Sequence, residues 1–219
     1  MMPAMMLDDH LRNGAPPIVA ILRGIAPDEA ADIGRALIDA GLRLIEVPLN
    51  SPQPLLSIER LAAIAAGRAL IGAGTVTSVD QVDQVIAAGG RLIVSPNTDT
   101  AVIARAVERA VDVLPGAMTP TEAFTALAAG AHHIKIFPSS SLGPAHVRAL
   151  REVLPVACKL WAVGGTSATN LAQWLEAGAL GIGVGSSLYR PGTTTKAAFA
   201  VASELVTAWH GTRTHSNKQ

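Results

Sequence analysis

One lysine, Lys135, lies where a positive charge is costly. The chain has four lysines, and only Lys135 stands inside an apolar run, Ile-Lys-Ile-Phe-Pro at 134–138. Burial disfavours an ammonium ion, and a nearby guanidinium would lower its pKa further, so the amine becomes a nucleophile near neutral pH. An amine of this kind forms Schiff bases with carbonyl compounds. The alternatives are a lysine that snorkels to the surface and one that forms a structural ion pair.

Three further side chains would complement a nucleophilic lysine. Glu46 can move protons while a carbinolamine forms and loses water, or it can simply hold Lys135 in an ion pair. Arg23 offers a planar fork to a carboxylate or a phosphate, or it is a structural arginine at the mouth of a barrel. Thr75 can donate its hydroxyl to a carboxylate, although inward threonines also fill barrels.

Two glycine-rich segments near the C-terminus indicate a phosphate site. Val163-Gly164-Gly165-Thr166 follows one apolar run, and Gly181-Ile182-Gly183-Val184-Gly185-Ser186-Ser187 spans the next. Glycine lets the backbone approach a phosphate closely, and its N–H groups then bind the anion. The alternative is glycine that serves only in turns.

The elements that position these candidate site residues follow a repeating pattern of helix-like and strand-like segments. Four segments end a helical pattern with Ala-Gly and continue into a short apolar run: 38–47, 86–95, 127–136 and 175–184. Four other strand-like runs lie between them: 19–23, 70–75, 112–116 and 160–164. Amphipathic stretches follow the eight runs: 27–40, 52–66, 78–88, 98–109, 119–129, 144–152, 167–177 and 193–208. Glycine can end a helix in the left-handed conformation before a strand begins.

Eight strand–helix units of similar length predict an α/β fold, a single-domain (β/α)8 TIM barrel. The alternative is a doubly wound open sheet, but no Gly-x-Gly-x-x-Gly follows the first strand. In a barrel the active site lies at the C-terminal ends of the strands, and side chains alternate between the interior and the helices. This alternation predicts that Arg23, Glu46 and Lys135 face inward. It also places Thr75 inward, on the same face as Ile71 and Ala73.

Composition excludes several classes of protein. Of the 219 residues 49% are hydrophobic, only 16% are charged, and the formal net charge is zero. A neutral chain offers no general attraction to nucleic acid or to anionic membranes. No apolar run approaches the ~20 residues that a spanning helix needs. The single cysteine, Cys158, excludes an internal disulfide and indicates a reduced, cytoplasmic setting. The scattered histidines do not support a metal site.

The ends of the chain carry weaker patterns. We expect residues 1–16 to form a poorly ordered leader, although this segment could tuck under a barrel. Residues 17–210 are predicted to form the barrel, and residues 211–219 a C-terminal tail. The leader carries charged residues where a signal peptide would need its apolar stretch.

The motifs resemble those of bacterial 2-keto-3-deoxy-6-phosphate sugar-acid aldolases (the KDPG/KDPGal class I aldolase family), from about Pro17 to Val206. The segments that carry the resemblance lie at 18–24, 45–52, 71–76, 95–97, 115–122, 135–138 and 162–165. The resemblance implies a TIM barrel, a homotrimer and a Schiff-base mechanism without a metal or other cofactor. It assigns the Schiff base to Lys135 and acid–base catalysis to Glu46. The substrate contacts expected are Arg23, Thr75, Pro96, Phe137, Val163, Gly164, Gly165, Gly185 and Ser186.

Two activities within this family differ only in the configuration of the substrate at C4. Members that act on the gluconate epimer usually carry arginine and threonine after the strand-two glutamate, and threonine before the Gly-Gly that ends strand seven. Here these places read Pro48-Leu49-Asn50-Ser51 and Val163. The pattern resembles members that cleave 2-dehydro-3-deoxy-6-phosphogalactonate to pyruvate and D-glyceraldehyde 3-phosphate. The alternative is the same retro-aldol reaction on the gluconate epimer, because a hydroxyl shift alone need not give strong discrimination.

Two other classes remain compatible with a phosphate-binding barrel. An isomerase would use a second acid or base in place of the inward lysine. A non-catalytic phosphosugar sensor would bind pyruvate or a phosphosugar without turnover, but the pair of Lys135 and Glu46 argues against it.

Overall fold

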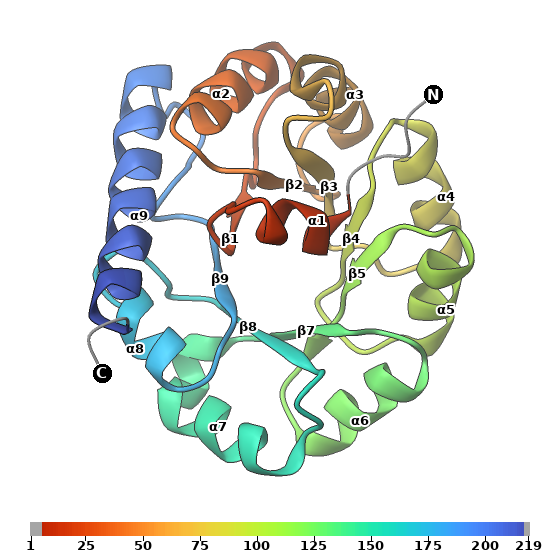
Figure 1. Ribbon diagram of the computed structural model, residues 1–219. Helices are drawn as coiled ribbons and strands as arrows, with labels where there is room; N and C mark the ends of the chain where they lie inside the picture. Colours follow the sequence, from red (N-terminus) through yellow and green to blue (C-terminus); the bar gives the residue numbers. More distant parts are fainter. Residues whose placement is uncertain (1–5, 217–219) are drawn as a thin grey trace.

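A ring of parallel strands surrounded by helices makes up the computed structural model, which describes residues 6–216 (Figure 1). The strands are β1 Ile18–Ile21, β2 Leu44–Pro48, β3 Leu70–Gly74, β4 Leu92–Val94, β5 Asp112–Leu114, β6 Gly116–Ala117, β7 His133–Ile136, β8 Lys159–Val163 and β9 Gly181–Val184. The helices are α1 Leu7–Arg12, α2 Pro27–Asp39, α3 Pro54–Ala65, α4 Val79–Ala87, α5 Thr100–Glu108, α6 Pro120–Ala128, α7 Ser139–Val153, α8 Leu171–Glu176 and α9 Thr195–Ser216. No helix in this part of the chain is long and apolar enough to cross a membrane.

The sheet closes into the predicted barrel rather than an open doubly wound sheet. Its strands are hydrogen-bonded in the order β5-β4-β3-β2-β1-β9-β8-β7-β6, and every pair is parallel. The two end members, β5 and β6, are separated only by Pro115. Proline cannot donate to a ladder, so one predicted strand becomes two, while the Pro115 carbonyl still accepts from Lys135 N at 2.8 Å.

Three helices begin at residues whose types favour a helix start. Thr119 and Glu122 form a reciprocal capping box at the start of α6. The Ser78 side chain accepts from Gln81 N at the start of α4. In α2, Pro27 occupies the first turn, where its missing N–H would have no helical partner. The predicted helix at 144–152 begins earlier, at Ser139, with a non-helical residue at Gly143.

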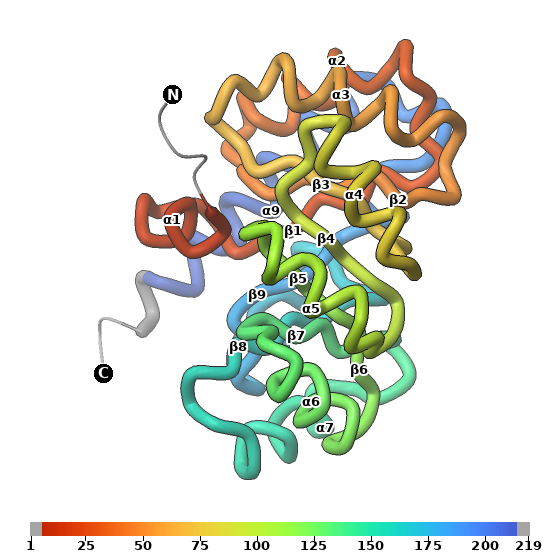
Figure 2. Tube along the Cα trace, turned by 90° about the vertical axis from the view of Figure 1, so that its right-hand side faces the viewer, coloured from red at the N-terminus to blue at the C-terminus, as the bar shows by residue number. Residues whose placement is uncertain are grey.

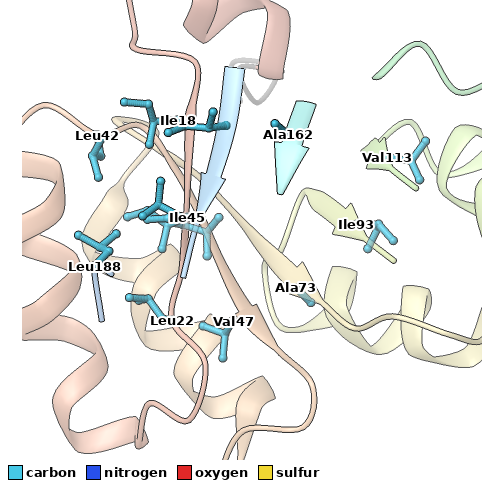
Figure 3. Close-up of a cluster of buried hydrophobic side chains, with 14 of the residues drawn as sticks. Ile18, Leu22, Leu42, Ile45, Val47, Ala73, Ile93, Val113, Ala162 and Leu188 are labelled. Carbon is cyan, nitrogen blue, oxygen red and sulfur yellow. The ribbon is translucent and has the colours of Figure 1, made fainter. Parts of the chain in front are cut away.

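Buried apolar side chains form two layers separated by the strands. The outer cluster lies between strands and helices and includes Ile18, Ile45, Ala73 and Ile93 (Figure 3). The inner cluster fills the barrel and comprises Leu7, Val19, Leu44, Leu70, Leu92, Val94, Leu114 and Trp161. Alternate residues of one strand therefore belong to different layers, which accounts for the high apolar fraction and low charge of the sequence.

Helix α1 closes one end of the barrel (Figure 1). Its Leu7 side chain is fully buried in the inner cluster, and Leu7 N donates to Asp112 Oδ2 at 2.7 Å. Asp8 accepts from Lys159 Nζ at 2.6 Å and lies 3.2 Å from His133 Nε2. In place of the poorly ordered leader expected for residues 1–16, the described part of this segment thus tucks under the barrel.

A buried histidine joins this end of the barrel to the strand that carries Lys135. Trp161 Nε1 donates to His133 Nδ1 at 3.0 Å, so the proton of the neutral imidazole sits on Nε2, which faces Asp8. Burial lowers the pKa of His133 to about 4 and keeps the ring neutral. His133 therefore serves as a packed polar link between β7, β8 and α1.

The opposite end of the chain also differs from expectation. The segment predicted as a tail, 211–219, continues α9 as far as Ser216. Residues 1–5 and 217–219, which belong to the predicted leader and tail, lie outside the described residues.

Helix α1 acts as a plug that closes the N-terminal end of the barrel, so removing its buried side chain should lower the free energy of unfolding. Leu7→Ala should reduce the free energy of unfolding by about 2–5 kcal/mol, because it leaves a cavity in the inner core. Val156→Ala, at a side chain that is 97% exposed, is the matched control and should change it by less than about 0.5 kcal/mol. Urea denaturation followed by circular dichroism measures both. Equal stability of the two variants would contradict a packed role for α1.

Candidate active site

All eleven residues expected at the site line one cavity of about 310 Å³. They are Arg23, Glu46, Thr75, Pro96, Lys135, Phe137, Val163, Gly164, Gly165, Gly185 and Ser186. The cavity lies toward the C-terminal ends of the strands, where active sites of this fold lie. Five other lining residues were not among the expected substrate contacts: Ile21, Thr166, Ser167, Gly183 and Ser187. Of these, Thr166, Gly183 and Ser187 belong to the two glycine-rich segments already expected to form a phosphate site.

The Lys135 amine is held in a desolvated position on β7. Lys135 is only 6% exposed, and its Nζ lies 4.8 Å from the centre of the Phe137 ring. Burial lowers the pKa of Lys135 to about 8, and the Arg23 charge lowers it as well, whereas the Glu46 charge raises it. Roughly a tenth of the amine is therefore uncharged at neutral pH, far more than for a lysine in water, and only this form is nucleophilic.

The Glu46 carboxyl group, on β2, is buried in the same cavity as the Lys135 amine. It is 3% exposed, and burial raises its pKa to about 7, against the opposing effects of Lys135, Arg23 and a backbone hydrogen bond from Gly74. Oε2 has no hydrogen-bond partner, and none of the ion pairs among the described residues involves Lys135. The direct structural ion pair considered from the sequence is therefore absent, and Glu46 retains a free oxygen for proton transfer.

Gly74 provides the space for this carboxylate. A Cβ built on Gly74 would overlap both carboxylate oxygens of Glu46. The neighbouring β3 residues Leu70 and Gly72 share the inward face with Gly74, and only a residue without a side chain leaves room for Glu46 there. The sequence showed this glycine, but its partner could only be identified once β2 and β3 were paired.

The route by which Thr75 reaches the cavity was predicted wrongly. Ile71 and Ala73 belong to the outer cluster, so a continued strand would direct Thr75 toward the helices. Instead β3 ends at Gly74, and Thr75 adopts a left-handed backbone with φ of 59°. This conformation is costly for a β-branched residue, and it turns the side chain toward the cavity.

Arg23 is oriented by the loop that follows β2. Its Nη1 donates to Asn50 Oδ1 at 2.7 Å, and the adjacent Gly24 N donates to Ser51 Oγ at 2.9 Å. Asn50 thus fixes the direction of the guanidinium at the mouth of the cavity, and Ser51 holds the adjoining backbone. Both belong to the segment 48–51 that the sequence used to separate the two activities, but neither was among the expected substrate contacts.

The glycine-rich ends of β8 and β9 form the opposite wall. Gly164 and Gly165 both have positive φ, 108° and 71°. Thr166 Oγ1 donates to Gly183 O at 2.6 Å, which ties the two loops together. Among the described residues, the backbone N–H groups of Gly165 and Ser186 have no hydrogen-bond acceptor, so both can bind an anion.

A buried serine connects the lysine strand to this wall. Ser139 is fully buried; its Oγ donates to Ile136 O at 2.6 Å and accepts from Val163 N at 2.9 Å. The hydroxyl thereby sets the spacing between the end of β7 and the end of β8. Within the described part of the chain, no three His, Cys, Asp or Glu side chains are grouped to bind a metal ion.

Comparison with known proteins identifies similar chains. The model of a family described as KDPG and KHG aldolase matches residues 7–203. The 2-dehydro-3-deoxy-6-phosphogalactonate aldolase of Escherichia coli K12 is 50% identical over 193 residues, which is 88% of this chain and 94% of that protein.

Solved structures agree with this match. A structure described as native KDPGal has a TM-score of 0.89 and 48% identity, covering 90% of this chain and 96% of that one. A KDPG aldolase from Legionella pneumophila, captured with pyruvate as a covalent carbinolamine intermediate, has a TM-score of 0.77 and 26% identity, covering 89% and 94%.

The contact between Gly74 and Glu46 predicts a specific coupling. Gly74→Ala should lower the free energy of unfolding by about 1–3 kcal/mol, because the new methyl group overlaps the carboxylate. Glu46→Ala in the same chain removes the overlapping atoms and should restore most of that loss. A double-mutant cycle by urea denaturation measures the coupling. Additive effects of the two substitutions would show that Gly74 does not accommodate Glu46.

Proposed function

The chain belongs to the KDPG and KHG aldolase family, and we propose that it cleaves 2-dehydro-3-deoxy-6-phospho-D-galactonate to pyruvate and D-glyceraldehyde 3-phosphate. The observation that carries the proposal is the pairing of a desolvated Lys135 with a desolvated Glu46 in one cavity. The activity named for the similar Escherichia coli enzyme supports the choice of epimer. The reaction is that of a class I, Schiff-base aldolase, a carbon–carbon lyase.

The first half of the mechanism builds an electron sink on Lys135. The neutral amine adds to the C2 carbonyl of the substrate and gives a carbinolamine. Glu46 delivers a proton to the departing hydroxyl, water leaves, and an iminium ion remains on Nζ. Glu46 suits this role because its raised pKa keeps it able both to give and to accept a proton near neutral pH.

The second half breaks the C3–C4 bond. Glu46, directly or through water, takes the proton of the C4 hydroxyl, and C4 becomes the aldehyde carbon of D-glyceraldehyde 3-phosphate. The bonding pair moves into an enamine between C3 and C2. Protonation at C3 restores the imine, and hydrolysis releases pyruvate and the free amine.

Substrate binding divides between the two walls of the cavity. We assign the phosphate to the wall formed by Gly164, Gly165, Gly185 and Ser186, where backbone N–H groups are available. Arg23 and Thr75 lie at the other wall and suit the carboxylate end. Pro96 and Phe137 supply apolar surface, and the Phe137 ring lies close to the reacting amine.

We further propose that the enzyme works in the cytoplasm as a homotrimer. Large apolar side chains that a lone chain would leave in water support self-association: Met118 is 42% exposed and Phe124 45% exposed. The family resemblance supplies the number of subunits.

The pH dependence of imine formation gives a signed test of the mechanism. Only the neutral amine attacks pyruvate, so the trapping rate should rise with pH up to about 8, the pKa of Lys135. Glu46→Gln removes the charge that raises this pKa, so the rising limb should move to lower pH. Arg23→Met removes a charge that lowers the pKa, so the limb should move to higher pH.

Borohydride trapping with pyruvate, followed by peptide mass mapping, measures these rates. The mass increase is expected on Lys135, while Lys159, held by Asp8 at the other end of the barrel, is the internal control. Labelling of Lys159 in place of Lys135 would remove Lys135 from the mechanism. Shifts of the two variants in the same direction would contradict the electrostatic account.

Val163 gives the choice of epimer a direct test. Its apolar side chain lines the cavity and cannot hydrogen-bond a C4 hydroxyl. A coupled pyruvate-release assay should give a higher kcat/KM with the galactonate epimer than with the gluconate epimer. Val163→Thr should narrow the ratio of the two kcat/KM values by roughly 2- to 13-fold, since a neutral hydrogen bond contributes about 0.5–1.5 kcal/mol. A higher kcat/KM of the natural enzyme on the gluconate epimer would favour the alternative activity.

A further inference from the structure

A second cavity lies at the end of the barrel opposite to the active site. It has a volume of about 450 Å³. Its walls come from the loops that enter β1, β2 and β3, together with α1 and α9. Figure 2 shows α1 and the C-terminal part of α9 projecting on the same side of the barrel. We call this the basal cavity.

Basic side chains line the basal cavity from four separate segments. Arg43 enters from the loop before β2, Arg68 from the loop before β3, His10 from α1 and His210 from α9. Among the described residues that line it there is no Asp or Glu. Because the whole chain has a formal net charge of zero, this concentration of guanidinium and imidazole groups is a local feature.

The protein satisfies only part of the hydrogen-bonding capacity of the two arginines. Arg43 donates through Nη1 alone, to Ile38 O at 2.6 Å and Leu42 O at 2.9 Å. The Arg68 contacts are long, 3.4 Å to Ile64 O and 3.7 Å to Asp39 Oδ1. Each guanidinium carries five N–H donors, so both arginines retain donors for a ligand.

His10 is a buried polar side chain without a partner. It is 3% exposed, yet no described residue forms a hydrogen bond with its imidazole. Its ring nitrogens are not sealed from solvent, and the residue lines the cavity, so the imidazole is available to a ligand there. Burial lowers the pKa of His10 and the nearby Arg43 charge lowers it as well, whereas Asp9, whose carboxylate is paired with Arg12, raises it. The imidazole therefore serves as a neutral hydrogen-bonding group in this cavity.

We propose that the basal cavity binds a small anion that carries a phosphate group. Two guanidinium forks and a histidine that approach from different directions match a tetrahedral group with three acceptor oxygens. The volume suits a phosphate ion or a small phosphate monoester. Such an anion joins α1 to the loops before β2 and β3, and so holds the plug against the barrel.

Hydrogen exchange of the full chain tests this site separately from the active site. Orthophosphate and glycerol 3-phosphate are the two probes, one a free ion and one a monoester. Either should protect residues 10–16, 41–43, 67–68 and 206–210 and raise the midpoint of thermal unfolding. Protection at 163–167 and 183–187 reports the active site independently.

Substitution of the arginines decides the assignment. Arg43→Met with Arg68→Met should weaken protection of the basal segments by roughly tenfold or more, because charge-assisted hydrogen bonds are lost. Arg68→Met alone should weaken it too, which keeps the test valid if loss of Arg43 impairs folding through α2. Arg35→Met, an exposed arginine outside the cavity, is the control and should behave like the natural chain.

Three results would overturn the proposal. In the first, neither probe protects the basal segments from hydrogen exchange. In the second, Arg68→Met is protected as strongly as the natural chain. In the third, the control Arg35→Met loses as much protection as Arg68→Met. Protection by glycerol 3-phosphate but not by orthophosphate would support a phosphorylated metabolite as the ligand, and the reverse would support free phosphate.

Discussion

Desolvation of one amine and one carboxyl group in the barrel is the constraint on which the site depends. In water Lys135 would be protonated and Glu46 ionised near neutral pH, and neither would suit imine chemistry. The apolar interior brings their pKa values to about 8 and about 7, so both groups exchange protons near neutral pH. Each charge also stabilises the other. The pair therefore limits the cost of burial while remaining reactive.

The two-layer core makes this environment possible. The outward residues of the strands pack on the helices, and the inward residues pack on each other. This packing leaves no room for bulk water below the site. Within that core, room for a carboxylate arises only where a side chain is missing, at Gly74. The wall to which we assign the phosphate offers backbone N–H groups in place of cationic side chains, so it adds no charge that would further lower the pKa of Lys135.

Sequence reasoning placed side chains in the cavity better than it placed local backbone. The inward direction of Lys135 and Glu46 was predictable because a charged residue in an apolar strand is costly and strand alternation fixes its direction. The path of Thr75 was not, because the left-handed φ that redirects it follows from the end of β3 rather than from residue type. The local sequence pattern also did not predict that Pro115 divides one strand or that α1 docks on the barrel. The residues that contact Leu7 lie far along the chain, and the sequence of the leader does not identify them.

The two ends of the barrel are coupled by the strands they share. On β2 the inward residues are Leu44 and then Glu46; on β7 they are His133 and then Lys135; on β8 they are Trp161 and then Val163. In each pair the first residue packs toward α1 and the second faces the substrate cavity. Packing and hydrogen bonds around the plug thus fix the height and rotation of the same strands that hold the amine and the carboxylate. A close-packed interior transmits such constraints over one strand step. The plug at the N-terminal end therefore belongs to the support of the active site, and an anion that secures it acts on the same strands.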